Sequence, residues 1–148
     1  MIDSGHIGFT TQPSTIAVDP WRVQLFCQAI GEADPIYRDE SAARDAGHPA
    51  CPVPPTFLRA IEADHCSAAE ILKILGIPVA SVLHAEQSFE YHAPVHVGDR
   101  IEVTRTLTDS YDKRDGALTF IVLDSHFRRE GETVCDSRQI IVVRNPKE

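Results

Sequence analysis

The stretch SVLHAEQSFEYHAPV, residues 81–95, changes the period of the sequence from helical to alternating. Its apolar residues alternate with polar ones, which is typical of a β-strand with one buried face. One predicted face carries Leu83, Ala85, Phe89 and Tyr91. The opposite face carries His84, Glu86, Ser88, Glu90 and His92. We therefore predict a strand that packs its apolar face against a core.

Three more strand-like stretches follow this one, and turn signals separate all four. The stretches are IEVTRTLT (101–108), LTFIVLDSHF (118–127) and TVCDSRQIIVV (133–143). The turn signals are Gly98-Asp99, Asp115-Gly116 and Gly131-Glu132. Glycine beside an acidic residue favours tight hairpin turns. Four long strands joined in this way predict an antiparallel meander.

The first half of the chain has helical spacing interrupted by proline-rich joints. A short strand is predicted at 14–18, and helices at 19–31, 39–46, 56–66 and 67–75. The segment CPVPP, residues 51–55, must be extended, because proline restricts itself and the residue before it. An antiparallel sheet needs a covered face, and the helix after CPVPP is the natural cover. We predict an α+β fold over residues 1–148, a single domain with an antiparallel sheet wrapped around a central helix.

Composition limits the classes of partner and location. The net charge of −8 argues against nucleic acid as a partner, because binding phosphates needs a basic surface. No apolar run approaches the ~20 residues of a membrane span, and the N-terminus does not resemble a signal peptide. The four cysteines, Cys27, Cys51, Cys66 and Cys135, form no CxxC pair. Reduced thiols in a cytoplasmic protein are the expected state.

The order of motifs along the chain resembles the MaoC-like dehydratases and (R)-specific enoyl hydratases. The most specific motifs are PPTF (54–57) and LHAEQSFEYHAPVHVGD (83–99), read in this order. Within that family the chain is similar to the branch of the dehydratase region of fungal fatty-acid synthase. The resemblance covers nearly the whole chain. It implies the hot-dog fold and reversible hydration of a trans-2-enoyl thioester, or dehydration of the (R)-3-hydroxyacyl thioester, carried on CoA or acyl carrier protein.

The stretch GEADPIYRDESAARDAG, residues 31–47, covers the catalytic motif of this family. Active members resemble a pattern of Gly-Asp, one residue, Asn-Pro, one residue and His, in which Asp and His form the catalytic dyad. In this chain Glu32 stands at the Asp position, Asp34 at the Asn position and Tyr37 at the His position. A tyrosine that titrates near ~10 is no base at neutral pH. Loss of the histidine predicts a rate lower by roughly 10² to 10⁴.

Substrate binding is predicted at the start of the helix after CPVPP. The free N–H groups and dipole of a helix N-terminus favour the negative charge that builds on a thioester carbonyl. The candidate substrate-binding residues are Pro55, Thr56 and Phe57.

The degenerate motif leaves three functional hypotheses. In the first, the chain is a dehydratase subunit, weak or inactive alone, that pairs with a second hot-dog subunit carrying an intact Asp and His. In the second, it is a homodimer that binds an acyl thioester without turnover, or an acyl-CoA thioesterase. In the third, Glu32, Asp34 or the strand histidine His84 takes over the acid–base role. Pairing is expected in each case, because one curved sheet leaves an apolar edge exposed.

Histidine spacing predicts no metal site. His84 and His92 are too far apart along an extended strand, at ~3.3 Å per residue, to bind one ion. His92 and His96 have the spacing of helical ligands but lie in a strand and a turn broken by Pro94. We expect no metal and no cofactor besides the acyl thioester.

Overall fold

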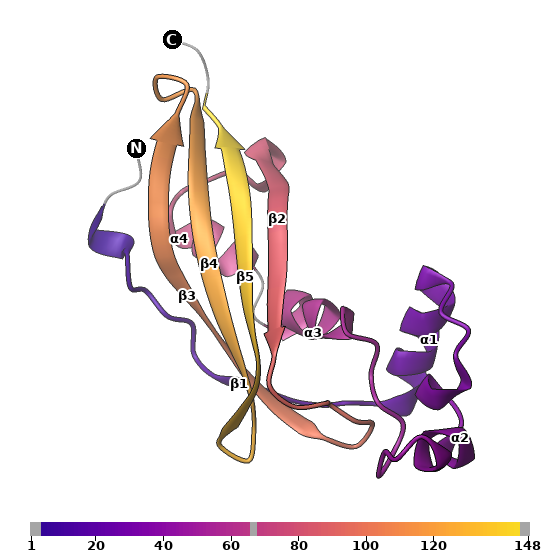
Figure 1. The fold of residues 1–148 in the computed structure, drawn as a ribbon. Helices are drawn as coiled ribbons and strands as arrows, with labels where there is room; N and C mark the ends of the chain where they lie inside the picture. The colour runs from indigo at the N-terminus through magenta and orange to yellow at the C-terminus, as the bar shows by residue number, and fades with distance from the viewer. Residues whose placement is uncertain (1–3, 66–67, 146–148) are drawn as a thin grey trace.

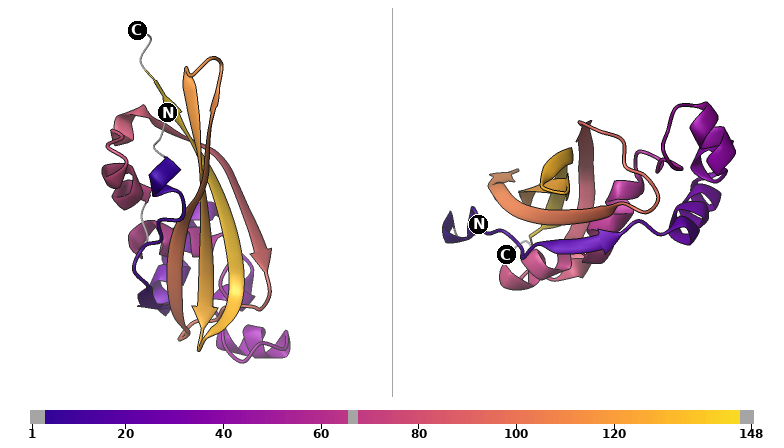
Figure 2. Two further views of the ribbon diagram at one scale, coloured as in Figure 1. Left: turned by 90° about the vertical axis from the view of Figure 1, so that its left-hand side faces the viewer. Right: turned by 90° about the horizontal axis from the view of Figure 1, so that it is seen from below.

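A computed structural model describes residues 4–65 and 68–145 of the chain. It contains a curved, five-stranded antiparallel sheet with strand order β1-β3-β4-β5-β2 (Figures 1 and 2). The strands are β1 (Ser14–Ala17), β2 (Val82–Tyr91), β3 (Arg100–Lys113), β4 (Leu118–Arg129) and β5 (Glu132–Arg144). The α-helices are α1 (Pro20–Ile30), α2 (Glu40–Asp45), α3 (Phe57–His65) and α4 (Ala68–Ile74). Short 3₁₀ helices are η1 (Ser4–His6), η2 (Pro35–Tyr37) and η3 (Val79–Ser81).

The strands β3, β4 and β5 form the predicted meander. Gly116 and Gly131, in the two hairpin turns, have φ angles of 85° and 86°, a conformation that glycine adopts without steric cost. The prediction that all four long strands form one meander is wrong, because β2 pairs with β5 and not with β3. Residues 92–99 instead carry the chain across the end of the sheet. Alternation identifies each strand, but it does not determine which strands are neighbours.

Strand β2 also departs from the predicted alternation. Its register with β5 shifts between His84 and Glu86, which is a β-bulge. As a result Val82, rather than Leu83, packs against the buried core. The Leu83 side chain is 50% exposed, so the prediction that Leu83 shares the apolar face of Phe89 is wrong.

Helices α3 and α4 cover one face of the sheet, while α1 and α2 extend beyond its end (Figures 1 and 2). The left-handed residue Gly31 ends α1 with φ 73°, as the sequence predicts. Asp39 caps α2 by accepting a hydrogen bond from the Ala42 N–H at 2.8 Å. Asp19 precedes α1, but its side chain makes no capping hydrogen bond. The predicted junction between the last two helices, with Cys66, lies outside the described residues.

The main core lies between α1, α3 and the sheet. Its buried members include Val23, Cys27, Val53, Phe57, Leu58, Ile61, Ile101, Val103, Phe127 and Cys135. Phe26 of α1 packs edge-to-face on Phe57 of α3, with ring centroids 5.4 Å apart. This contact joins α1 to the helix beneath the sheet.

A buried polar cluster joins α3 to the sheet. Glu62 of α3 is completely buried and accepts hydrogen bonds from the hydroxyls of Ser125 and Ser137, at 2.5 and 3.0 Å. Its second carboxylate oxygen lies 3.6 Å from the guanidinium of the fully buried Arg105. The guanidinium of Arg105 in turn donates to the side-chain oxygen of Gln139. The cluster fixes the helix on the sheet through charge-assisted contacts.

Candidate active site

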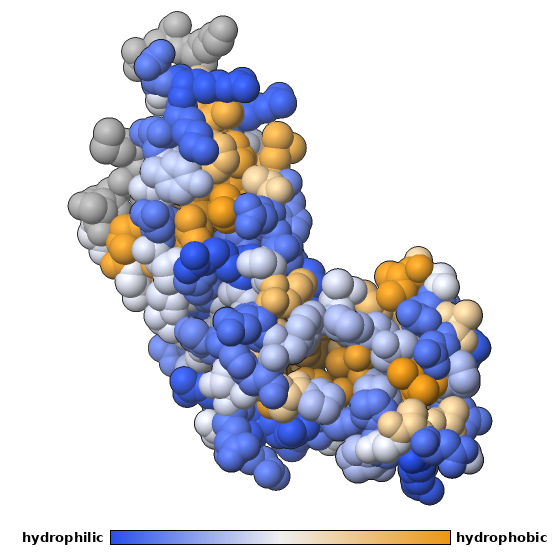
Figure 3. All heavy atoms as spheres, viewed as in Figure 1, coloured by the Kyte–Doolittle hydropathy of each residue, from blue (hydrophilic) through white to orange (hydrophobic). Residues whose placement is uncertain are grey.

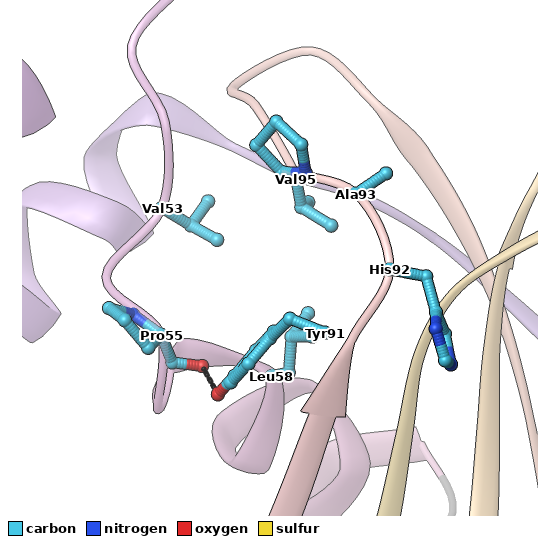
Figure 4. Close-up of a pocket in the computed structure, with 8 residues that line it drawn as sticks. Val53, Pro55, Leu58, Tyr91, His92, Ala93 and Val95 are labelled. Carbon is cyan, nitrogen blue, oxygen red and sulfur yellow. Dashed lines mark hydrogen bonds between the residues drawn. The ribbon is translucent and has the colours of Figure 1, made fainter.

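An apolar cavity of about 340 Å³ lies between the CPVPP segment and the end of β2. Its lining residues are Val53, Pro55, Leu58, Tyr91, His92, Ala93, Pro94 and Val95 (Figure 4). Apolar side chains also gather in the hollow between the sheet and the α1–α2 segment (Figure 3). A concave, mostly apolar cavity of this size is typical of small-molecule sites.

Two extended segments that are far apart in sequence hold this cavity open. The Val53 N–H donates to the Val95 carbonyl at 2.9 Å, and the Val97 N–H donates to the Cys51 carbonyl at 2.8 Å. Prolines in both segments prevent either from continuing as a regular strand. The cavity therefore lies where the segment before α3 meets the segment after β2.

Tyr91 lines the cavity and reaches from β2 to the CPVPP segment. Its hydroxyl donates a 2.6 Å hydrogen bond to the Pro55 carbonyl (Figure 4). Burial, together with the nearby Cys135, raises the pKa of Tyr91 to about 12. The phenol therefore remains protonated at neutral pH and serves as a hydrogen-bond donor. The alternating pattern predicts Tyr91 on an apolar strand face but gives no sign of its place at the cavity.

The residues predicted to bind substrate occupy the start of α3 with different roles. Pro55 lines the cavity and Thr56 is exposed beside it, whereas Phe57 is 2% exposed and belongs to the core. Leu58 also lines the cavity. Its backbone N–H lies in the first turn of α3, where an intrahelical acceptor is missing, and it has no hydrogen-bond partner among the described residues.

The carboxylates of the degenerate motif are bound within their own turn. Glu32 accepts a hydrogen bond from the Asp34 N–H at 2.8 Å. Asp34 accepts one from the Ile36 N–H at 3.0 Å and caps the 3₁₀ helix η2. Both carboxylates thus stabilise the turn that carries Tyr37.

Tyr37 packs against the core cluster that contains Val53 and Phe57. Burial raises the pKa of Tyr37, and the negative charges of Glu32 and Asp34 raise it further. The phenol is therefore protonated at neutral pH and cannot accept a proton as a histidine does.

The four residues predicted to be catalytic do not share one site. Glu32, Asp34 and Tyr37 share one turn, but none of them is among the residues that line the cavity. His84 lies near the other end of β2, about 23 Å from Tyr91 at the usual rise per strand residue. Its Nε2 atom lies 3.0 Å from the Glu86 carbonyl oxygen. The geometry therefore separates His84 from both the turn and the cavity.

Comparison with known proteins identifies the class of fold. The HadBC (3R-hydroxyacyl-ACP dehydratase) complex of Mycobacterium tuberculosis aligns with a TM-score of 0.80 and 21% identity, over 93% of this chain and 96% of that chain. A MaoC-like dehydratase aligns with a TM-score of 0.82 and 22% identity, over 95% of this chain and 42% of that chain. The curved antiparallel sheet packed on α3 is the hot-dog fold, an α+β architecture.

Sequence comparison identifies the family. Residues 5–137 match the family model described as FAS1-like, dehydratase domain region. A UPF0336 protein of Saccharopolyspora erythraea is 30% identical over 148 residues, covering 99% of this chain and 94% of that protein. The chain belongs to the FAS1-like dehydratase domain region family, which confirms the resemblance drawn from its motifs. None of the helices in the described part of the chain is long and apolar enough to cross a membrane.

Proposed function

We propose that this chain is the acyl-binding subunit of an (R)-3-hydroxyacyl thioester dehydratase, which also runs as a trans-2-enoyl thioester hydratase. A second hot-dog subunit with an intact Asp and His supplies the proton-transfer groups, and this chain is weak or inactive alone. The single observation that carries the proposal is the tyrosine at the family's histidine position. Its phenol, half-buried near two carboxylates, keeps its proton at neutral pH.

The reaction needs a base that the degenerate turn does not supply. In hydration, a base takes a proton from water as the oxygen adds to C3 of the enoyl group, and the α-carbon receives a proton. Glu32 keeps a carboxylate, but that carboxylate already accepts the Asp34 N–H. Tyr37 at neutral pH offers only a hydrogen-bond donor. The missing base explains why a partner subunit is required.

The features that remain suit binding of an acyl thioester. The cavity beside Pro55 and Leu58 is mostly apolar, which matches an acyl chain. The Leu58 N–H at the start of α3, which has no partner in the described part of the chain, offers a donor for the thioester oxygen, supported by the helix dipole. The acyl carrier is CoA or acyl carrier protein.

The free edge of β2 supports pairing with a second chain. Among residues 4–65 and 68–145, β5 is the only strand that pairs with β2, so one side of β2 has backbone groups unpaired within that part of the chain. Exposed apolar side chains, Leu83 and Tyr91, lie along the same strand. The structural neighbour HadBC is itself a complex. The pair in this case is a heterodimer with the catalytic subunit, in a cytoplasmic setting.

The test is hydration of trans-2-enoyl-CoA, followed as loss of enoyl absorbance, by the chain alone and mixed with hot-dog proteins encoded beside it. We expect no robust turnover by the chain alone, and a gain in rate with a partner that has the intact motif. Binding of enoyl-CoA by the chain alone, measured by calorimetry, checks the acyl-binding role. Robust turnover by the isolated chain would refute the subunit proposal. Release of free CoA would instead indicate a thioesterase.

A further inference from the structure

A cluster of titratable side chains lies on the outer face of the sheet, opposite the face that α3 covers. Glu90 on β2, Asp136 on β5 and His126 on β4 are direct cross-strand partners in the sheet register. The next residue on β5, Ser137, turns inward and hydrogen bonds to α3. Because side chains alternate along a strand, Asp136 and its cross-strand partners point outward.

Hydrogen bonds connect Asp136 to two histidines. His92 Nε2 lies 2.8 Å from one carboxylate oxygen of Asp136, and His126 Nδ1 lies 2.5 Å from the other. One ligand atom from each of Glu90, His92 and Asp136 lies within 4.8 Å of the other two. The Glu90 carboxylate has no hydrogen bond or ion pair with any residue in the ranges 4–65 and 68–145.

The arginine that shares the outer face of β5 with Asp136 is already paired with another carboxylate. The nearest arginine on the strand, Arg138, is engaged by Asp124 in a bidentate pair with distances of 2.7 and 2.8 Å. The carboxylates of Glu90 and Asp136 therefore have no arginine partner among the described residues.

We propose that Glu90, His92 and Asp136 form a binding site for a divalent first-row transition cation, with His126 as a positioning residue behind Asp136. One imidazole and two carboxylates are a donor set that suits Zn²⁺ and Mn²⁺. Three protein ligands leave coordination positions for water. The hydrogen bond from His126 fixes the orientation of the Asp136 carboxylate, as outer partners of metal ligands do.

The geometry needs only small side-chain rotations to accept an ion. Zinc lies about 2.0–2.2 Å from nitrogen and oxygen ligands, so two tetrahedral ligands are roughly 3.4 Å apart. The His92 and Asp136 atoms are 2.8 Å apart, and all three donors are within 4.8 Å. Binding replaces the proton that His92 and Asp136 share. That proton moves to the other ring nitrogen, which leaves the Nε2 lone pair free for the ion.

Sequence spacing alone gave the opposite expectation of no metal site. Glu90 and His92 are two residues apart, but the third ligand, Asp136, comes from a neighbouring strand that is distant in sequence, so spacing along the chain does not reveal the set. His92 also lies at the boundary of the apolar cavity, with its ring directed away from Val53 and Pro55 (Figure 4). A bound ion therefore ties β2 to β5 next to the cavity wall.

The experiment uses the full chain without a polyhistidine tag, freed of metal with a chelator. Zn²⁺ is titrated by calorimetry, and Co²⁺ by visible absorption, which distinguishes a low-coordinate protein site from the aqueous ion. Asp136→Asn and Glu90→Gln are the test variants. His84→Gln is the matched control, because it removes an exposed histidine of β2 that lies outside the cluster. Thermal unfolding with and without Zn²⁺ gives a readout independent of activity.

We expect one Zn²⁺ per chain, a rise in the unfolding temperature, and at least about tenfold weaker binding in both test variants. The control should bind as the unmodified chain does. Glu90→Gln keeps the test valid if Asp136→Asn fails to fold, because the exposed Glu90 carboxylate makes no hydrogen bond or ion pair within residues 4–65 and 68–145. Absence of stoichiometric Zn²⁺ binding, or unchanged binding in Glu90→Gln, would overturn the proposal. Equal affinity for Mg²⁺ would overturn the assignment to a transition cation.

Discussion

Replacing Glu62 by alanine tests the role of the buried cluster that fixes α3 on the sheet. Glu62 and Arg105 are both completely buried, with 3.6 Å between the carboxylate and the guanidinium. Removing the acid leaves the Arg105 charge in the core without its acidic partner. The hydroxyls of Ser125 and Ser137 also lose their shared acceptor.

The expected loss is about 3–5 kcal/mol in the free energy of unfolding, the usual cost of removing one member of a buried ion pair. Against a total stability of roughly 5–15 kcal/mol, this is a large fraction. With a urea dependence of roughly 2 kcal/mol per M, the unfolding midpoint should fall by about 2 M. Urea unfolding followed by circular dichroism measures this shift.

Two further variants separate charge from packing. Glu70→Ala, on the exposed side of α4, is the matched control and should change stability by less than about 0.5 kcal/mol. Replacing Glu62 and Arg105 together by leucine removes both charges and should recover most of the loss. A Glu62→Ala loss below about 1 kcal/mol, or a double variant as unstable as the single one, would refute the reasoning.

Three other predictions concern the site. Glu32→Asp combined with Tyr37→His restores the dyad and should raise enoyl-CoA hydration by roughly 10² to 10⁴ in an absorbance assay. Tyr91→Phe removes the hydrogen bond to the Pro55 carbonyl and should lower the free energy of urea unfolding by about 1 kcal/mol. Burial lowers the pKa of His96 from its ordinary 6.5, so the unfolded chain binds a proton first as the pH falls. The free energy of unfolding should therefore decrease as the pH falls below about 6.5. In urea unfolding at pH 7.5 and 5.5, the His96→Gln variant should lose less of this free energy than the original chain.

Each of these predictions has a matched control. For the restored dyad, the control Tyr111→His changes a tyrosine on β3 and should leave the rate of enoyl-CoA hydration unchanged. If the double variant folds but shows no gain in rate, the idea of a degenerate catalytic site is contradicted. Tyr111→Phe is the control for Tyr91→Phe. Equal stability of these two variants would contradict a stabilising hydrogen bond between Tyr91 and the Pro55 carbonyl. The control for His96→Gln is His84→Gln, which removes an exposed histidine. If His96→Gln and the original chain show the same pH dependence of stability, His96 is not the group responsible for it.

The sequence was sufficient for most elements of the fold because local physics determines them. Asp39 and Gly31 mark helix ends through a capping side chain and a left-handed backbone, and both act as predicted. The neighbour of β2 could not be predicted, because hydrogen bonding between strands depends on where residues 92–99 lead the chain. The bulge at His84 was also hidden, since an extra residue leaves no compositional mark.

The site was less predictable than the fold. The Tyr37 position came from the family resemblance, and the structure adds the cause of its protonated state. The cavity was missed because its walls, at Val53 and Val95, meet only through tertiary contacts. The two proline-containing segments were the available signal, since neither continues as a regular strand. The outer cluster around Asp136 was hidden for the same reason, because its members come from three strands.

The strand order has a consequence for how the chain folds during synthesis. β5 lies between β4 and β2, yet it is the last of the five strands to leave the ribosome. Until it emerges, β2 has no neighbour in the sheet, and the inner face that covers α3 is incomplete. The long sequence separation between β2 and β5 makes their pairing a late, slow event. Nascent chains that stall before residue 132 would therefore expose an unpaired β2 and a free edge of β4, and would depend on chaperones for protection.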